Sequence, residues 1–372
     1  MTQSKASYQH FLSIQPGLED LLIKEIEYRF HQTEVFFIQN IQKEKGGVTL
    51  ECPLGTTEYL LKYLKSPTRI NLEITQFRAT DFPKLFKKIE NFNWSKILRY
   101  PKFNISSTCI KSRLIHSDRV SETVEKSIQK YYQMNPPSPK QEALLPDDFY
   151  YPIKVRLHND QCKISIDISQ HADGSEFFKK DLKAKNAKAS LRENIAFCLL
   201  ALRDKKDTPH VLLDPMAGAG TIALMSKDRA DDKEKVFDYL KIPYDKLKKT
   251  VIPKYPRYEK YLLNDIDSTH YNFLKENFQG QENVEIKNED FKDLELSEQY
   301  TLFCNLPYGK RIKIDKKEFL GSLFRWFQKY QKELNTIDII APYEWQNEFK
   351  KQGFKITSTF ENGGLKVCFY TK

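Results

Sequence analysis

The sequence predicts an α/β fold in which a parallel sheet of the Rossmann type, residues 191–372, follows an α+β module in residues 1–170. Two observations support this division. In the second half, five short apolar stretches alternate with helical patterns, which is typical of a parallel sheet covered by helices. In the first half, the patterns describe a smaller unit of mixed strands and helices. A length of 372 residues also favours two or three domains over one.

Residues 1–64 form the first predicted unit. YQHFLSI is typical of a strand and Pro16-Gly17 of a turn, and the apolar residues of LEDLLIKEI recur at helical spacing with Glu25 on the outer face. Gly46-Gly47 opens the alternating strand VTLEC, and TTEYLLKYL follows as a helix.

Residues 65–170 form the second predicted unit. It contains the strand RINLEITQF, the helix DFPKLFKKIENFNW, the strand KFNISSTCI and the helix SDRVSETVEKSIQKYYQ. The polar, proline-containing residues 134–149 are predicted to be a loop. YYPIKVRLHND and CKISIDIS are a final pair of strands.

Residues 171–190 are predicted to connect this module to the second half. There, ASLRENIAFCLLALRD has the pattern of an amphipathic helix, and the five strands are HVLLDP, EKYLLNDID, EIKNEDF, YTLFCNLP and TIDIIAP. THYNFLKENF and EFLGSLFRWFQKYQKEL are helices between them. Residues 226–260, charged and proline-containing, have the character of an insertion.

Composition limits the class of protein. No run approaches the roughly 20 apolar residues of a membrane span, and the N-terminus lacks a signal-peptide pattern, so we expect a soluble cytoplasmic protein. The six cysteines include no C-x-x-C pair and the seven histidines show no ligand spacing, so we expect buried reduced thiols and no metal. A net charge of +10, shared by both halves, favours a polyanionic partner such as nucleic acid.

The first candidate motif is HVLLDPMAGAGTI, in which a buried strand ends at Asp214 and a loop of small residues opens a helix. Glycines let a ligand approach the backbone closely, and the helix start offers free N–H groups. The carboxylate of Asp214 favours a ligand with a cationic centre, such as S-adenosylmethionine, over a pyrophosphate. The predicted cofactor-binding residues here are Asp214, Met216, Ala217, Gly218, Ala219, Gly220 and Thr221.

Acidic residues follow the next two strands. In LLNDIDS, Asp265 comes directly after the apolar run and is predicted to bind the ribose hydroxyls of an adenosine, with Ile266 beside it. Asp267 could instead be the N-cap of the next helix. In IKNEDFKDL, Asp290 is predicted to accept from the adenine amino group, and Phe291 to lie on the ring or present its backbone N–H. Taken alone, this last stretch fits an ordinary acidic loop better.

The stretch NLPYG ends the fourth strand. Asn305 supplies an amide oxygen and Leu306 a backbone carbonyl, and two adjacent acceptors suit the two hydrogens of an exocyclic NH2 group. Pro307 fixes the turn, and Tyr308 offers a face on which a base can stack. The predicted chemistry is methyl transfer to a planar nitrogen, helped mainly by proximity and orientation. Asn305 is also predicted to contact the cofactor.

Cys304, the residue before this stretch, lies within the apolar strand. A nucleophilic cysteine would indicate carbon methylation of a pyrimidine, but a buried thiol is the prediction here.

Together these motifs resemble the THUMP-domain RNA guanine-N2-methyltransferases, in particular the bacterial type that acts on large-subunit ribosomal RNA. The resemblance covers nearly the whole chain. It rests on PGLEDLLIKEI, GGVTLE, FRATDFPKLFKKIENFNW, STCIKSRLIHSDRV and ISIDIS, and then on ASLRENIAF, DPMAGAGTI, NLPYGKR and ENGGLKV.

The resemblance implies a class I methyltransferase domain at 191–372, with S-adenosylmethionine as donor and S-adenosylhomocysteine as product. It implies a ferredoxin-like subdomain at 1–64 and a THUMP RNA-binding domain at 65–170. It also implies RNA as the partner, with contacts from Lys111, Arg113, His116, Lys310 and Arg311.

Several alternatives stay open at this point. Leu306 stands where the family often has Pro, whereas related tRNA enzymes have a Leu at this position. Both rRNA and tRNA therefore remain candidate substrates. Ala217 stands where the family often has Cys. Asn-x-Pro-Tyr also serves N6-adenine methylation, although the THUMP-like half and ENGGLKV argue against a DNA enzyme. A non-catalytic RNA-binding assembly factor is the alternative from another class. An NAD oxidoreductase is disfavoured because no G-x-G-x-x-G follows HVLLDP.

Overall fold

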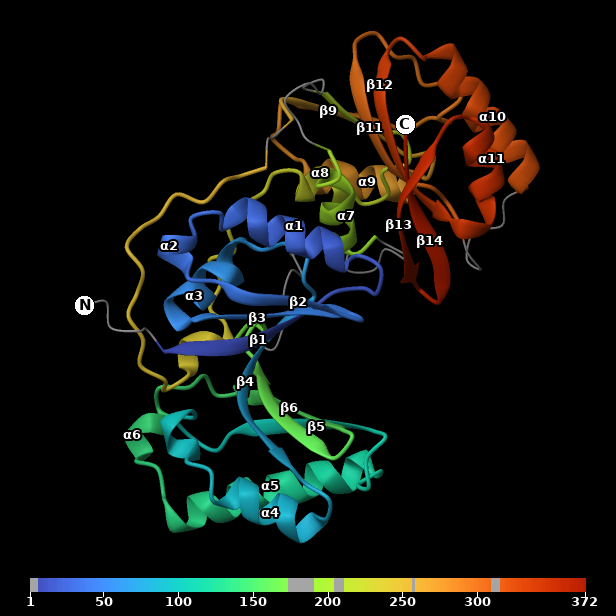
Figure 1. The fold of residues 1–372 in the computed structure, drawn as a ribbon. Helices are drawn as coiled ribbons and strands as arrows, with labels where there is room; N and C mark the ends of the chain where they lie inside the picture. Colours follow the sequence, from blue (N-terminus) through green and yellow to red (C-terminus); the bar gives the residue numbers. More distant parts are fainter. Residues whose placement is uncertain (1–5, 173–190, 204–210, 256–257, 309–314) are drawn as a thin grey trace. The chain divides into compact units, whose positions relative to one another are not determined.

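The computed structural model describes residues 6–172, 191–203, 211–255, 258–308 and 315–372 (Figure 1). The chain divides into two compact units, each made of separate stretches of sequence. The first unit contains Met1–Ser13, Phe30–Phe177 and Ala230–Val251, and the second contains Ile14–Arg29, Phe178–Arg229 and Ile252–Lys372. Of the helices in the described part of the chain, none is long and apolar enough to cross a membrane.

The first unit is built on a seven-stranded sheet with the order β2-β3-β1-β4-β7-β6-β5. All neighbouring strands pair antiparallel except β5 and β6, which are parallel. The central strand β4 joins the two predicted N-terminal units, 1–64 and 65–170, into one sheet; the boundary between them remains a proposal. The strands are β1 (Ser7–Ser13), β2 (Gln39–Glu44), β3 (Gly47–Pro53), β4 (Arg69–Arg78), β5 (Phe103–Ile110), β6 (Tyr151–His158) and β7 (Gln161–Asp167).

The helices of the first unit are α2 (Thr33–Phe36), α3 (Leu54–Tyr63), α4 (Phe82–Glu90), α5 (Ser117–Met134) and α6 (Pro139–Glu142). Asp81 caps α4 by accepting from the backbone N–H of Lys84 at 2.8 Å. Helices α4 and α5 pack together, and α5 packs on β5 (Figure 1). Short helix α6 lies within the predicted loop 134–149, because Pro139 has the backbone angle of a first helical residue.

The second unit is built on a seven-stranded sheet with the order β10-β9-β8-β11-β12-β14-β13. The five predicted strands pair parallel, which confirms the α/β fold; the last two strands, which the sequence did not indicate, pair antiparallel at one edge. The strands are β8 (Val211–Asp214), β9 (Lys260–Asn264), β10 (Val284–Lys287), β11 (Tyr300–Asn305), β12 (Leu334–Pro342), β13 (Lys355–Asn362) and β14 (Leu365–Thr371).

The helices of the second unit include one from the far N-terminal part of the chain. They are α1 (Glu19–Arg29), α7 (Glu193–Leu200), α8 (Thr221–Met225), α9 (Ser268–Asn277), α10 (Lys316–Lys329) and α11 (Gln346–Lys351). Helix α7 was predicted to be amphipathic, but all its residues from Asn194 to Leu200 are buried, because it packs against both α8 and β12.

The prediction for Glu25 on α1 is also wrong, since its side chain is fully buried rather than on the outer face. Arg29, one helical turn later, donates to Glu25 Oε1 at 2.9 Å and to Asp228 Oδ1 at 2.7 Å. A buried charge is tolerated when it is paired and hydrogen-bonded. Residue Asp228 is distant in sequence, so helical spacing alone could not indicate this partner.

The predicted insertion, 226–260, has little regular structure in its described residues: a single 3-10 turn at Val236–Tyr239. Its central part, Ala230–Val251, belongs to the first unit, whereas its two ends belong to the second. Most of the predicted connecting segment, residues 173–190, lies outside the described residues.

Candidate active site

Four loops at the carboxyl ends of β8, β9, β10 and β11 surround one cavity of about 1280 Å³. Ligands of open parallel sheets bind at this edge, and the volume exceeds the roughly 300–1000 Å³ of an ordinary small-molecule pocket. The predicted catalytic and cofactor residues that line it are Asp214, Met216, Ala217, Gly218, Ala219, Thr221, Asp265, Ile266, Asp290, Phe291, Asn305, Leu306, Pro307 and Tyr308.

Gly220 alone among those predictions does not line the cavity. Its backbone has φ +81°, and a Cβ there would lie 2.5 Å from Cε2 of Phe278. This glycine therefore starts α8 and lets α9 pack closely against it. Its role is to shape the loop rather than to touch a ligand.

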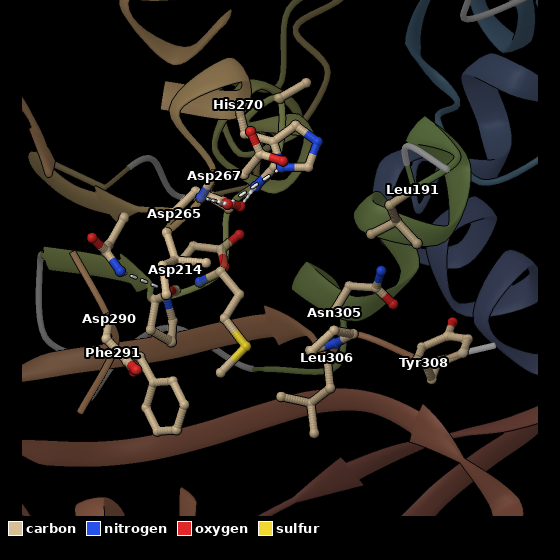
Figure 2. A pocket seen from close by; sticks show the side chains of 18 of the residues that line it. Leu191, Asp214, Asp265, Asp267, His270, Asp290, Phe291, Asn305, Leu306 and Tyr308 are labelled. Carbon is tan, nitrogen blue, oxygen red and sulfur yellow. Dashed lines mark hydrogen bonds and ion pairs between the residues drawn. The ribbon is translucent and has the colours of Figure 1, made fainter. Parts of the chain in front are cut away.

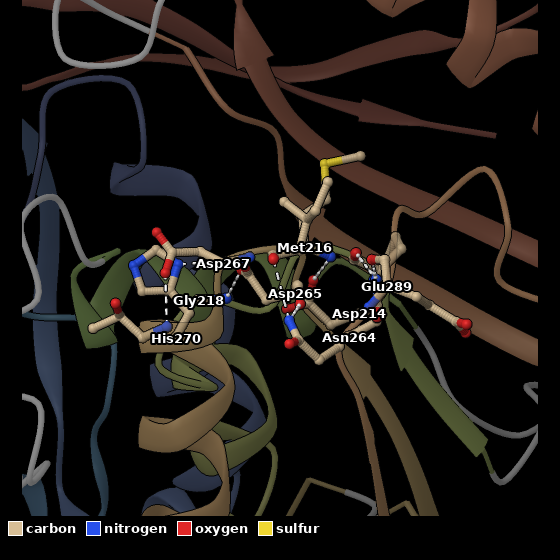
Figure 3. Close-up of polar contacts among 12 residues, drawn as sticks. Asp214, Met216, Gly218, Asn264, Asp265, Asp267, His270 and Glu289 are labelled. Atoms are coloured by element: carbon tan, nitrogen blue, oxygen red, sulfur yellow. Dashed lines mark hydrogen bonds and ion pairs between the residues drawn. The ribbon is translucent and has the colours of Figure 1, made fainter.

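The loop after β8 is held by the carboxylate of Asp265 (Figure 3). Asp265 Oδ2 accepts from the backbone N–H of Gly218 at 2.8 Å, and Oδ1 accepts from that of Asp267 at 3.0 Å. Gly218 has φ +55°, and no atom of the described residues beyond its chain neighbours lies within 4 Å of where its Cβ would be. The backbone of Gly218 is thus open to the cavity, and Oδ2 of Asp265, which accepts one hydrogen bond, retains acceptor capacity.

Asp267 takes the other role that the sequence left open. It is the N-cap of α9, and its side chain accepts from the backbone N–H of Thr269 at 2.7 Å. His270, in the first turn of α9, places Nδ1 3.3 Å from Asp265 Oδ1, and this hydrogen bond raises the pKa of the imidazole. His270 was not among the predicted residues; its place in the first turn of the helix that follows LLNDI was the available signal.

Asn264, also missed, ties three of the loops together and is fully buried. Its Nδ2 donates to the carbonyls of Pro215 and Glu289, both at 3.0 Å, and its Oδ1 accepts from the backbone N–H of Glu289 at 3.2 Å. Its own carbonyl accepts from the N–H of Ala217 at 2.8 Å. An amide ending an apolar strand was the signal for this role.

Asp214 is the most deeply buried carboxylate of the site, with 1% of its surface exposed. Its Oδ1 accepts from the backbone N–H of Met216 at 3.3 Å. Burial raises the pKa of Asp214 to about 8, and the negative charge of Asp265 adds to the effect. A cation bound beside Asp214 would stabilise its ionised form.

The loop after β10 forms another wall of the cavity. Asp290 accepts from the backbone N–H of Lys292 at 3.0 Å and pairs with its ammonium at 2.8 Å. The ring of Phe291 packs edge-on against Phe319 and Trp326, with centroid distances of 5.9 and 6.1 Å. Phe291 therefore belongs mainly to the core beneath the cavity, which favours its backbone rather than its ring face as the ligand contact.

The end of β11 forms the wall with the predicted catalytic residues. The backbone N–H of Leu306 donates to the carbonyl of Ile340 at 3.1 Å, and the Leu306 side chain is buried. Asn305 Oδ1 is buried and has no hydrogen-bond partner among the residues that the structure describes. In Figure 2, Asn305 and Tyr308 lie at one side of the pocket, with Asp290 and Phe291 at the other. A buried acceptor without a partner lowers the stability of the fold, and a ligand that donates a hydrogen bond to it removes this cost.

All six cysteines are free, and all but the half-buried Cys109 are buried. Cys304 is buried, as its place in an apolar strand predicted, and burial raises the pKa of its thiol well above the usual value. Within the described ranges, no group of three or more histidine, cysteine or acidic residues could hold a metal ion.

Three of the five predicted RNA-binding residues are in the first unit, on the loop between β5 and α5. Lys111 has φ +47°, His116 precedes the first residue of α5, and the Arg113 side chain is 70% exposed. Arg113 donates its backbone N–H to Asp160 Oδ1 at 2.8 Å. The other two predicted residues, Lys310 and Arg311, lie outside the described part of the chain.

Comparison with known families identifies two domains. Residues 79–167 match the THUMP domain, and residues 180–341 match the RMKL-like methyltransferase domain. The chain therefore combines a THUMP domain with an RMKL-like methyltransferase domain, as the sequence resemblance predicted.

Individual relatives agree with this pairing of domains. The chain is 27% identical over 230 residues to "Ribosomal RNA large subunit methyltransferase K/L" of Buchnera aphidicola, a match that covers 59% of this chain but only 30% of that protein. It is 23% identical over 375 residues to "Putative RNA methyltransferase YpsC" of Bacillus subtilis, covering 95% of this chain and 93% of the relative.

A solved structure shares the whole fold. "SMU.472, a putative methyltransferase complexed with SAH" superposes with a TM-score of 0.74 at 20% identity, over 99% of this chain and 98% of that one. S-adenosylmethionine, the cofactor that the sequence predicts, agrees with the matched methyltransferase domain and with the acidic, glycine-lined cavity.

Proposed function

We propose that this protein is an S-adenosylmethionine-dependent RNA methyltransferase that forms N2-methylguanosine in large-subunit (23S) ribosomal RNA. The observation that carries the proposal is the buried Oδ1 of Asn305, at the end of β11, which has no hydrogen-bond partner within the described ranges. It lies in a cavity that is also lined by Asp214, Asp265 and Asp290 from the ends of other strands. The THUMP domain and the names of the relatives support RNA as the substrate.

The β8 and β9 loops are suited to hold the donor. Asp214 can attract the ammonium group of the methionine part of the donor. Gly218 has no side chain, so its backbone leaves room for the donor. Asp265 can accept hydrogen bonds from the ribose hydroxyls. Asp290 and the backbone N–H of Phe291 are suited to the adenine edge. When bound, S-adenosylmethionine supplies a methyl group on a positively charged sulfur.

The β11 end is suited to hold the target nitrogen. Asn305 Oδ1 and the carbonyl of Leu306 can each accept one hydrogen of the guanine NH2, so the nitrogen lone pair faces the methyl carbon. With S-adenosylmethionine held in the β8 and β9 loops, its methyl carbon would bond to the nitrogen that Asn305 and Leu306 orient, while the electron pair of the broken C–S bond would remain on sulfur. The nitrogen would then lose one proton to water. Positioning, and stabilisation of the developing positive charge by the two oxygens, account for the rate.

The test is nucleoside mass spectrometry on separately purified rRNA and tRNA from cells that lack the gene. We expect N2-methylguanosine to fall in large-subunit rRNA and to return when purified protein and labelled donor are added. A loss confined to tRNA would keep the chemistry and reject the substrate. No change in any modified nucleoside would favour the non-catalytic RNA-binding factor instead.

A further inference from the structure

The antiparallel edge of the methyltransferase sheet ends in a tight turn beside the cavity. Strands β13 and β14 are joined by Gly363 and Gly364 alone, and Asn362 pairs with Leu365 across the turn. Both glycines have positive φ, +59° and +77°, which a two-residue hairpin of this kind requires at both positions. The turn therefore fixes where Asn362 stands.

Asn362 reaches from this turn to the β11 end. Its Nδ2 donates to the hydroxyl of Tyr308 at 3.3 Å, and both residues line the cavity. The two are 54 positions apart in sequence. No other hydrogen bond to the Tyr308 hydroxyl occurs among the described residues, so Asn362 is what restrains the end of this half-buried ring there.

We propose that Asn362 is a positioning residue for Tyr308, and that the turn at residues 362–365 forms one wall of the site for the target base. This inference rests on the proposed function, together with the prediction from the sequence that the target base stacks on the Tyr308 ring. Packing against the core beneath it holds one part of the Tyr308 ring, so the hydrogen bond from Asn362 is what fixes the ring at its hydroxyl end. Small misplacements of a positioning group reduce rates strongly. Within the part of the chain that the structure describes, no atom beyond the chain neighbours lies within 4 Å of a Cβ built at Gly363 or Gly364, so the turn leaves room for a nucleotide.

The test measures steady-state kinetics with an RNA substrate, together with donor affinity by calorimetry. We expect Asn362→Ala to lower kcat/KM for RNA about tenfold and to leave the donor Kd within about twofold, because Asn362 touches Tyr308 and not the β8 or β9 loops. Tyr308→Phe removes the same hydrogen bond from the other side and should give a loss of similar size. If Asn362→Ala folds poorly, Tyr308→Phe still tests whether this hydrogen bond matters.

The double variant separates positioning from a general structural effect. If Asn362 acts through the Tyr308 hydroxyl, Asn362→Ala combined with Tyr308→Phe should be no worse than either alone. Glu361→Gln, on the same strand and outside the cavity lining, is the matched control and should keep wild-type kinetics.

Three results would overturn the inference. Multiplicative losses in the double variant would show that the two residues act independently. A donor Kd that weakens as much as kcat/KM falls would show a disturbed sheet edge. Wild-type kinetics in Asn362→Ala, with an active parent enzyme, would remove the positioning role and leave the proposed function intact. A parent enzyme inactive on every RNA tested would instead reject the proposed function, and this inference with it.

Discussion

The carboxyl edge of the methyltransferase sheet and the β5–α5 loop of the THUMP domain use polar residues in opposite ways. At the sheet edge, Asp265 is 8% exposed and Asn264 fully buried, and their side chains bond to backbone groups of neighbouring loops. On the β5–α5 loop, Asp160 accepts from the backbone N–H of Arg113 and lies 3.6 Å from its Nε, while the Arg113 side chain remains 70% exposed. The first region is a preformed pocket. The second is a surface loop whose backbone is held in place while its charged side chains are exposed.

This difference predicts how sensitive each region is to substitution. Charges and hydrogen bonds removed from water interact strongly, so single changes at the sheet edge should have large and specific effects. Exposed charges are screened by salt, and each contributes little. The predictions that follow test this contrast, starting with the pocket.

The largest effect is expected at Asn305. Asn305→Ala removes the buried acceptor, and loss of one such group from an active site typically costs about 100- to 1000-fold in kcat. We expect turnover to fall by that amount while the Kd for donor and for RNA changes less than about threefold. Single-turnover methylation with both substrates saturating measures it. Asn347→Ala, an exposed asparagine on α11, is the control. Near-normal turnover in Asn305→Ala would remove the catalytic assignment.

The next effect is expected in donor binding. Asp265→Ala removes the proposed ribose acceptor and also frees the N–H groups of Gly218 and Asp267, so donor affinity should fall by about 10- to 100-fold. RNA affinity should not change. Asp267→Ser is the comparison, because serine can also cap α9 and should keep donor affinity. Calorimetric titration of donor distinguishes them; equal losses in both variants would mean that the two aspartates share one role.

Asp214 should make donor binding depend on pH. Its pKa of about 8 in the free protein means that the carboxyl is mostly neutral at pH 6.5, whereas the donor's ammonium favours the ionised form. Binding should therefore release a proton, and affinity should rise with pH up to about 8, by at most about tenfold per pH unit. The same raised pKa makes the stability of the donor-free protein depend on pH. Its contribution to the free energy of unfolding is complete below pH 3.8, the ordinary pKa of this group, and is lost as pH rises through about 8.

Calorimetry at pH 6.5 in two buffers with different ionisation heats counts the released protons. The count for wild type minus that for Asp214→Asn removes any titration of the donor itself. An equal count in the two proteins would show that Asp214 does not ionise on binding, and that the ammonium lies elsewhere.

The sheet edge was also the part of the molecule most open to prediction from sequence. Each parallel strand is a continuous apolar run that ends in a polar residue, and chain order alone brings Asp214, Asp265, Asp290 and Asn305 to one edge. Local pattern could not supply the contacts between distant stretches. Glu25 can be buried because it pairs with Arg29, which also pairs with Asp228, 199 positions further along the chain. Asn362 contacts Tyr308 only because the last two strands run antiparallel at the edge of the sheet.

The smallest effect is expected at the β5–α5 loop. Lys111→Gln combined with Arg113→Gln should weaken RNA binding only a few-fold at physiological salt and leave kcat unchanged at saturating RNA. If both side chains neutralise phosphates, the slope of log K against log salt should become shallower by about 0.7–0.9 for each phosphate that is no longer neutralised. Filter binding over a range of salt concentrations measures this slope.

The matched control keeps both charges in place: Lys111→Arg with Arg113→Lys should preserve the salt slope. A fall in kcat with an unchanged slope would contradict the contrast between the two regions, because it would show that this loop acts on the chemical step rather than on phosphate binding. A shallower slope with unchanged kcat would mean that the loop contributes screened, additive charge. That result would agree with the proposal that base-specific contacts come from the pocket, through Asn305 and Tyr308, rather than from this loop.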